Sequence, residues 1–197
     1  MQQEKQSECV TYLESFVKIS DSDVSKLILG GNSKSCNMDP IPTDQLLPTL
    51  LPSITTIINK SITEGKMPRS LKKADVTPYL KQTSFPKENL KNCRPVSNLA
   101  FIGKCIEKVA IKQMEKHLSD NNLNEPLQSA YKTNHRTEIA LIKVTNDILL
   151  GLDKRLCTYL VLLDLSAAFD TVDHQVFLNQ LQHEYGMRGG VVEWMSS

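Results

Sequence analysis

The stretch LVLLDLSAAFDTVDH, residues 160–174, contributes most to the prediction of the fold. It contains the end of an apolar run of strand-forming residues, 157–163, that shows no polar alternation. Such a run predicts a β-strand covered on both faces. The strand would end at Asp164, and small residues follow, so a ligand would have room beside this carboxylate. Ligands are commonly held at such a sheet edge.

Asp164 has two interpretations on its position alone. As a functional residue it would bind Mg²⁺, which prefers oxygen ligands and commonly bridges a carboxylate to substrate phosphates. As a structural residue it would cap the turn that follows the strand. Acids at a sheet edge mark functional sites only in some proteins, so both interpretations stay open at this point.

Elements upstream and downstream follow from apolar periodicity and from cap residues. Strands are expected over residues 74–80 and 93–97, joined by a basic loop into a hairpin-like unit. Helices are expected where apolar residues recur at helical spacing between cap and stop signals. These helices cover approximately residues 20–30, 43–47, 52–65, 102–120, 137–149, 174–185 and 191–195.

Charge is distributed unevenly along the 197 residues, although the formal net charge is only +1. Residues 66–116 hold 12 Lys and Arg against 4 Asp and Glu, which is +8, and the remainder hold 11 against 18, which is −7. With 40% hydrophobic and 23% charged residues, the composition is that of a globular protein and excludes collagen and mostly disordered chains. The cationic middle predicts a face that meets a polyanion.

The five cysteines argue against a zinc site, because none forms a CxxC pair or lies close to a histidine. An odd, scattered set is typical of reduced thiols inside the cell, so nucleus or cytoplasm is the expected location. The longest apolar run, residues 159–163, is far too short to span a bilayer, and no membrane partner is expected.

Residues 160–174 resemble the first catalytic motif of reverse transcriptases from non-LTR, LINE-type retrotransposons of the jockey-like branch. Other blocks occur in that family's order and spacing. They are SCNMDPIPT (35–43), IINKSITEGKMPRSLKKADVTPYLK (57–81), NCRPVSNLAFIGKCIEKV (92–109), QSAYKTNHRTEIAL (128–141) and GMRGGVVEW (186–194). Because several blocks recur together, the resemblance is far more specific than a lone strand followed by Asp.

The resemblance implies part of a right-hand polymerase fold of the α/β (α+β) class. Residues 1–65 would be a helical extension leading into the fingers, residues 66–150 the fingers, and residues 151–197 the start of the palm. The family's reaction is RNA-directed DNA synthesis, with an RNA template, a DNA primer, deoxynucleoside triphosphates and two Mg²⁺ ions. Asp164 matches the first metal-binding aspartate, and the backbone carbonyl of Leu165 would supply a further oxygen.

Further roles carry over by position. Arg94 would clasp the incoming triphosphate and stack on its base, and Phe169 would lie under its sugar. Less specific matches are Lys72 and Lys73 for the nucleotide, and Lys81, Gln128 and Lys132 for the template. Each has a structural alternative: Phe169 as a core aromatic, the cations as ordinary surface charges, and the others as loop residues. Asp170, Asp173 and His174 match the motif as well and are expected to cap and orient the next helix.

One departure limits the expected activity. The family carries two adjacent aspartates on a later palm turn, and no Asp-Asp pair occurs among the 197 residues. The sequence is therefore expected to be an inactive portion of such an enzyme that covers the fingers and the first palm motif. The alternatives are a non-catalytic RNA- or DNA-binding remnant that uses residues 66–116, and a relic without function.

Overall fold

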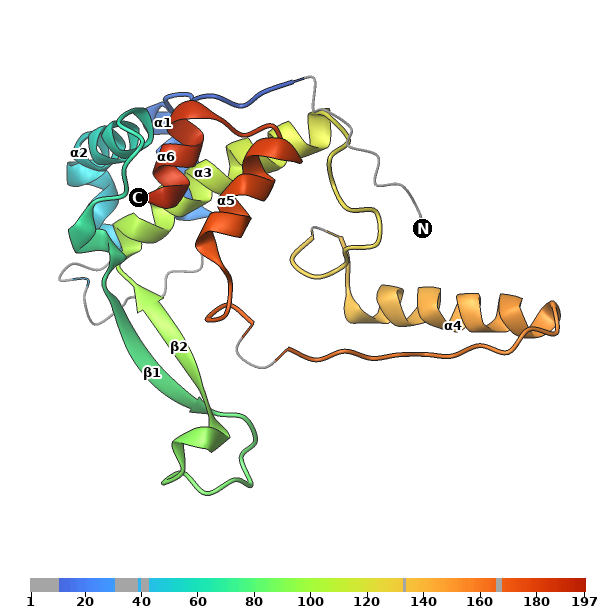
Figure 1. Ribbon diagram of the computed structural model, residues 1–197. Coiled ribbons are helices and arrows are strands. Elements are labelled where there is room, and N and C mark those ends of the chain that lie inside the picture. The colour runs from blue at the N-terminus through green and yellow to red at the C-terminus, as the bar shows by residue number, and fades with distance from the viewer. Residues whose placement is uncertain (1–10, 31–38, 40–42, 133, 166–167) are drawn as a thin grey trace. The chain divides into compact units, whose positions relative to one another are not determined.

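The computed structural model describes residues 11–30, 39, 43–132, 134–165 and 168–197 (Figure 1). The chain divides into two compact units, one within residues 1–121 and 174–197 and the other within residues 122–173. Helices and one two-stranded antiparallel sheet make up the described elements, which confirms the predicted α+β class. No helix among these described residues is long and apolar enough to cross a membrane.

Helix α1 (Asp21–Leu29) begins with the predicted cap. The Asp23 backbone N–H donates to the Ser20 hydroxyl at 3.2 Å, and the Ser20 N–H donates to the Asp23 carboxylate at 3.3 Å. This reciprocal pair satisfies two donors that a helix start leaves unpaired. The hydrogen bonds from Ser20 also lower the pKa of the Asp23 carboxyl group, because they stabilise its charged form.

Helix α2 (Thr43–Thr63) corrects the prediction of two helices in this region. The two were separated at Pro48 and Pro52, yet the structure has one helix through both prolines. A proline inside a helix removes one backbone hydrogen bond. Three isoleucines at helical spacing bury almost completely in the second half, and this packing favours a continuous helix. They are Ile54, Ile58 and Ile62.

The hydrophobic core of the first unit lies among helices α1, α2, α3 (Phe101–Asp120) and α6 (Gly189–Ser196), with one buried leucine from α5 (His174–His183). Trp194 closes one side: its ring meets Phe16 edge-on at 5.8 Å between centroids, and its indole N–H donates to the Ser61 hydroxyl at 3.2 Å. Helices α3, α5 and α6 lie close to their predicted positions. The fully buried members of the core include Val24, Ile58, Ile106, Met187 and Val191.

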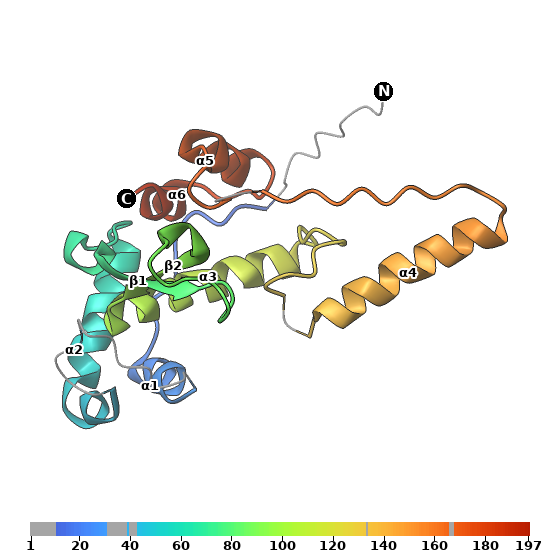
Figure 2. The ribbon, with the colours of Figure 1, turned by 90° about the horizontal axis from the view of Figure 1, so that it is seen from below.

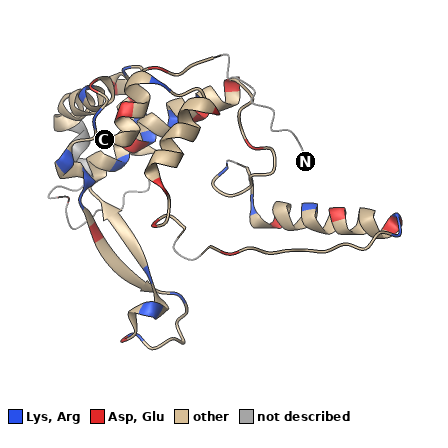
Figure 3. Ribbon diagram, viewed as in Figure 1, with Lys and Arg blue, Asp and Glu red and all other residues tan. Residues whose placement is uncertain are grey.

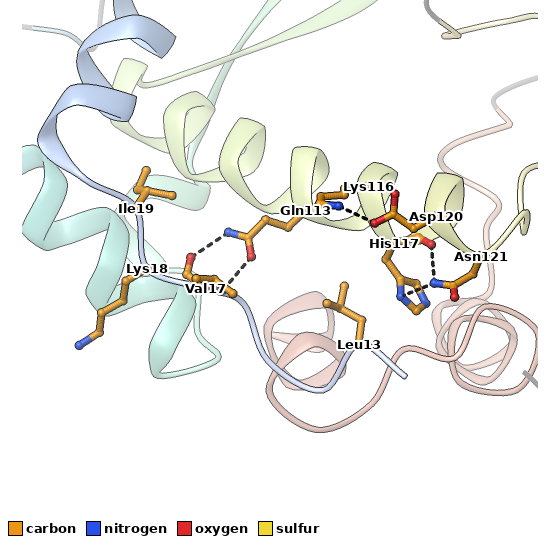
Figure 4. A pocket seen from close by; sticks show the side chains of 9 residues that line it. All are labelled: Leu13, Val17, Lys18, Ile19, Gln113, Lys116, His117, Asp120 and Asn121. Carbon is orange, nitrogen blue, oxygen red and sulfur yellow. Dashed lines mark hydrogen bonds and ion pairs between the residues drawn. The ribbon is translucent and has the colours of Figure 1, made fainter. Parts of the chain in front are cut away.

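Side-chain amides hold the extended segment that precedes α1. Gln113 of α3 accepts a hydrogen bond from the Val17 N–H at 2.7 Å and donates to the Val17 carbonyl at 2.9 Å (Figure 4). Asn59 of α2 makes the same two bonds with Ile19, each at 2.9 Å. The amide groups thereby take the place of a neighbouring β-strand.

The hairpin of β1 (Ala74–Leu80) and β2 (Cys93–Leu99) projects from this helical core (Figure 1). Short 3₁₀ turns precede the two strands, at Arg69–Lys72 and Leu90–Asn92. Both strands were predicted, and β2 extends two residues further than expected. In the antiparallel register Tyr79 faces Arg94 and Pro78 faces Pro95.

The facing prolines lie where the ladder does not need their missing N–H groups. One position beyond the strands, the Lys81 N–H donates to the Asn92 carbonyl at 2.8 Å. Hydrogen-bonded and non-hydrogen-bonded pairs alternate along an antiparallel ladder. Tyr79 and Arg94 are therefore a hydrogen-bonded pair, whereas Pro78 and Pro95 are not. Each proline occupies the outer edge of its strand, the position that a proline tolerates.

The second unit contains α4 (Thr137–Asp153), which begins at the predicted residue. Its N-cap is Arg136, which makes no side-chain hydrogen bond to the helix. No residue of α4 is buried, and Leu141 and Ile142 are at least 60% exposed. Within its own unit the apolar side of this helix is therefore exposed.

The buried strand predicted for residues 157–163 is wrong for this structure. The chain there is extended but forms no ladder (Figure 2). Its side chains are exposed, up to 89% at Tyr159 and Leu163. A strand exists only when a neighbour takes up its backbone hydrogen bonds, and the described ranges place none beside this segment. The apolar run shows that the segment can be buried, but it does not supply the partner that would bury it.

Candidate functional site

The candidate residues divide between the two units, and each group is considered within its own unit. The hairpin and the turn before it, in the first unit, carry Arg94 and the candidate lysines. The second unit carries the loop before α4 and the segment after it. Its candidates are Gln128, Lys132, Asp164, Leu165 and Phe169.

Arg94 lies on β2 with its side chain exposed. Among the described residues no ion pair holds its guanidinium group, since the pairs formed there join other residues, namely Lys60 with Glu64, Lys116 with Asp120 and Lys143 with Asp147. An exposed guanidinium on a regular strand presents its planar donors to solvent, where a phosphate can bind them in pairs. The position therefore suits the predicted contact with a nucleotide triphosphate.

Two of the three candidate lysines have partners within the protein. The Lys72 ammonium donates to the backbone oxygen of Ser197, and the Lys81 ammonium donates to the Lys91 carbonyl at 2.9 Å. Lys81 thus braces the hairpin loop from one side to the other. Lys73 follows the 3₁₀ turn in an extended conformation and is exposed.

The loop at the end of the hairpin adds cations that the sequence interpretation did not single out. Lys87 and Lys91 are exposed there, with Glu88 as the acidic neighbour. In Figure 3 this end of the hairpin carries blue, basic segments. Residues 79–94 hold four Lys and Arg against one Glu, which is +3. The end of the hairpin therefore carries a local excess of positive charge.

Gln128 and Lys132 lie in the irregular connection before α4. The Gln128 side chain donates to the Ala130 carbonyl at 3.1 Å, and Lys132 is half-buried. Between them Tyr131 has φ +58° and is 93% exposed, a left-handed conformation that is uncommon for a bulky side chain. These contacts fit the structural alternative, a self-braced polar loop, and they leave template contact by this loop as a prediction.

Asp164 and Leu165 lie on the extended segment rather than at the edge of a sheet, and Phe169 lies in a turn before α5. The Asp164 carboxylate is exposed, and Leu165 and Phe169 are 76% and 81% exposed. Phe169 is thus no core aromatic in this structure. The family resemblance had it under the nucleotide sugar, and that role stays a prediction. Asp170 is exposed, and Asp173 directly precedes α5, which begins at His174.

A magnesium site does not fit the residues present. Across the described ranges no three His, Cys, Asp or Glu side chains gather at a point where they would hold a metal ion. Asp164 together with the Leu165 carbonyl offers two ligand groups, whereas Mg²⁺ needs near-octahedral coordination and is usually shared with substrate phosphates. The remaining carboxylates of a two-ion site would have to come from outside the described residues.

Two side chains of α3, in the first unit, have raised pKa values, and neither belongs to the candidate site. Burial raises the pKa of the Cys105 thiol to about 11, with only 2% of the residue exposed. Burial also raises the pKa of the Glu107 carboxyl group, against a smaller opposing effect of Lys104. Both shifts follow from the cost of charging a group away from water.

A groove of about 490 Å³ runs between α3 and the extended segment before α1 (Figure 4). His117 lies in its wall, with Nε2 2.8 Å from the Tyr185 carbonyl and Nδ1 3.2 Å from the Asn121 amide nitrogen. Nε2 therefore donates and Nδ1 accepts, which satisfies the ring without any ligand. No candidate site residue lines this groove.

The sequence analysis did not single out Tyr79 as a functional candidate. The register places Tyr79 directly opposite Arg94, and 56% of the tyrosine is exposed. An exposed aromatic residue beside an arginine is the available signal, but it becomes visible only once the pairing of the two strands is known.

No curated protein matches the chain. The family model for reverse transcriptase (RNA-dependent DNA polymerase) matches residues 85–188, which is more than half of the chain and includes Arg94, Gln128, Lys132, Asp164 and Phe169. The chain therefore belongs to the reverse transcriptase family.

Proposed function

We propose that the chain supplies the fingers and the first palm motif of an RNA-directed DNA polymerase of the non-LTR, LINE-type, jockey-like branch. The match over residues 85–188 carries this proposal, since it joins the hairpin arginine and Asp164 in one family domain. Residues 66–150 would act as fingers and residues 151–197 as the start of the palm. RNA template, DNA primer and deoxynucleoside triphosphates are the partners that this reaction needs.

Within that function Arg94 binds the incoming triphosphate, because it is the exposed planar cation of the hairpin. Phe169 excludes a 2′-hydroxyl from the sugar site, and Lys73 adds a phosphate contact. Asp164 and the Leu165 carbonyl alone do not make a Mg²⁺ site, and they would contribute to one only if further carboxylates came from outside the described residues.

The first prediction is that the purified 197-residue chain does not extend a primer. One carboxylate cannot hold two ions in the geometry that the reaction needs, and misplacement of reacting groups alone costs orders of magnitude in rate. Primer extension on an RNA template with Mg²⁺ and deoxynucleotides should give no product above the level without protein. An active reverse transcriptase on the same primer and template is the positive control.

Product from the chain itself would overturn the claim of inactivity if it depends on the template and disappears in Asp164→Asn. Product that persists in Asp164→Asn would instead indicate a contaminating polymerase. The family assignment rests on the sequence match and stands in either case.

A second candidate function is nucleic-acid binding without catalysis, favoured by the exposed cations of the hairpin. If about four phosphates are neutralised, the affinity for single-stranded RNA falls roughly 50-fold between 50 and 200 mM salt. Fluorescence anisotropy with a labelled 20-nucleotide RNA measures this dependence.

Charge reversal distinguishes RNA binding at the hairpin from general attraction of RNA to the positive charges of the protein. The variant Lys73→Glu, Lys87→Glu, Arg94→Glu should lose most of the binding and most of the salt dependence. The matched control reverses three exposed cations elsewhere, Lys18, Lys26 and Lys154, and should change both much less. Equal losses in the two variants would reject the hairpin as the binding site.

A further inference from the structure

The two faces of the β1–β2 hairpin differ in chemistry. Directly paired residues place their side chains on the same face, and the faces alternate along each strand. One face carries Tyr79 and Arg94, and then Thr77 with Val96 and Asp75 with Asn98. The other face is apolar apart from Ser97. Its members are Ala74, Val76, Pro78, Leu80, Cys93, Pro95 and Leu99.

Tyr79 and Arg94 form the outer end of the polar face. As a hydrogen-bonded pair their Cα atoms lie about 5.5 Å apart. The structure gives neither side chain an ion pair or hydrogen bond among the described residues, and both are exposed. The acid on this face, Asp75, lies four residues from Tyr79, about 13 Å along the strand.

The surroundings favour a nucleic acid over a protein partner. Lys87 and Lys91 lie in the loop beyond the pair, and Lys81 is fixed by its bond to the Lys91 carbonyl. A flat phenol ring beside a guanidinium group, next to a positive loop, offers one surface for a base and another for a phosphate. Aromatic residues in positively charged grooves bind single strands in this way, because every base has a stacking face.

We propose that Tyr79 is a base-stacking residue that acts together with Arg94. One nucleobase of a single strand, or of a bound nucleotide, stacks on the Tyr79 ring, and Arg94 binds a neighbouring phosphate. The inference deepens the proposed function and rests on it, because it takes Arg94 as a nucleotide-binding residue. In this inference Tyr79 contacts the base, whereas Arg94 and the neighbouring lysines contact phosphates.

The test compares two ligands of equal charge with the full 197-residue chain. One is a labelled 12-nucleotide oligothymidine, and the other is a 12-residue abasic deoxyribose-phosphate strand. Tyr79→Ala should weaken oligothymidine binding about tenfold, since stacking on one aromatic side chain contributes that much, and should leave abasic binding unchanged within about twofold. Arg94→Gln should weaken binding of both strands.

Val76→Ala is the matched control. Val76 lies on the same strand with the same exposed fraction, 56%, but on the apolar face. It should change neither affinity, and Tyr79→Phe should retain oligothymidine binding because the ring remains. Far-UV circular dichroism and thermal unfolding of each variant check that the hairpin still folds.

The outcomes distinguish a failure of the stacking role of Tyr79 from a failure of the proposed nucleotide binding by Arg94. If Tyr79→Ala weakens both strands equally, or neither, while Arg94→Gln weakens both, Tyr79 is no stacking residue and the proposed function stands. If Arg94→Gln changes neither affinity, the hairpin does not bind nucleotides through Arg94. The proposed role of Arg94 and the inference on Tyr79 then fall together.

Discussion

Replacing Ile106 by Ala is expected to lower the free energy of unfolding by about 2–5 kcal/mol, because the deletion leaves a cavity that the core fills only in part. Ile106 is 0% exposed and lies on α3 within the core of the first unit. A domain of this kind is stabilised by only about 5–15 kcal/mol in total, so the variant should unfold at a much lower urea concentration.

Ile111→Ala is the matched control for this experiment. It removes the same atoms from the same helix, at a position that is 50% exposed. Its effect should stay within about 0.5–1 kcal/mol, since an exposed side chain leaves little cavity behind. Similar losses in both variants, measured by urea unfolding at constant m-value, would contradict the position of Ile106 in the core.

The Cys105 thiol should react with iodoacetamide at least about 100-fold more slowly in the folded protein than in urea at pH 7.5, because only the thiolate reacts. Burial raises its pKa to about 11, so far less of it is ionised than in the unfolded chain. Exclusion of the reagent from a site that is 2% exposed slows the reaction further. Peptide mass spectrometry reads the rate at each cysteine separately.

Cys157 provides the internal comparison, since it is exposed in the structure. Its labelling rate should be similar in the folded and unfolded chain. Equal protection of both cysteines on folding would show that the segment around Cys157 is covered. Rapid labelling of Cys105 in native conditions would show that α3 does not pack as described.

Local features of the fold were predictable wherever the residues themselves determine the outcome. Ser20 and Asp23 cap α1 through their own side chains, and the strand boundaries at Ala74 and Leu80 follow from local composition. Helix α2 was divided incorrectly, because the packing of its buried isoleucines outweighs what two prolines cost locally. That balance depends on neighbours that are distant in the sequence.

The segment 157–163 shows what a local pattern cannot predict. Its apolar run describes the environment that the residues favour, but β-structure requires a second strand, and no pattern within seven residues identifies one. The same limit applies to the site. Arg94 was predictable from its motif, whereas its pairing with Tyr79 depends on register, and the bond between Lys81 and the Lys91 carbonyl depends on how the loop closes.

The facing prolines of the hairpin determine how this arm can meet other molecules. Pro78 lies on the outer edge of β1 and Pro95 on the outer edge of β2. Each presents a ring where an additional strand would require a backbone hydrogen-bond donor. The addition of a third strand to either edge of the hairpin, from another polypeptide or from a second copy, is therefore disfavoured. Recognition by the arm is thus left to side chains, and these can be exchanged in evolution without altering the backbone that carries them.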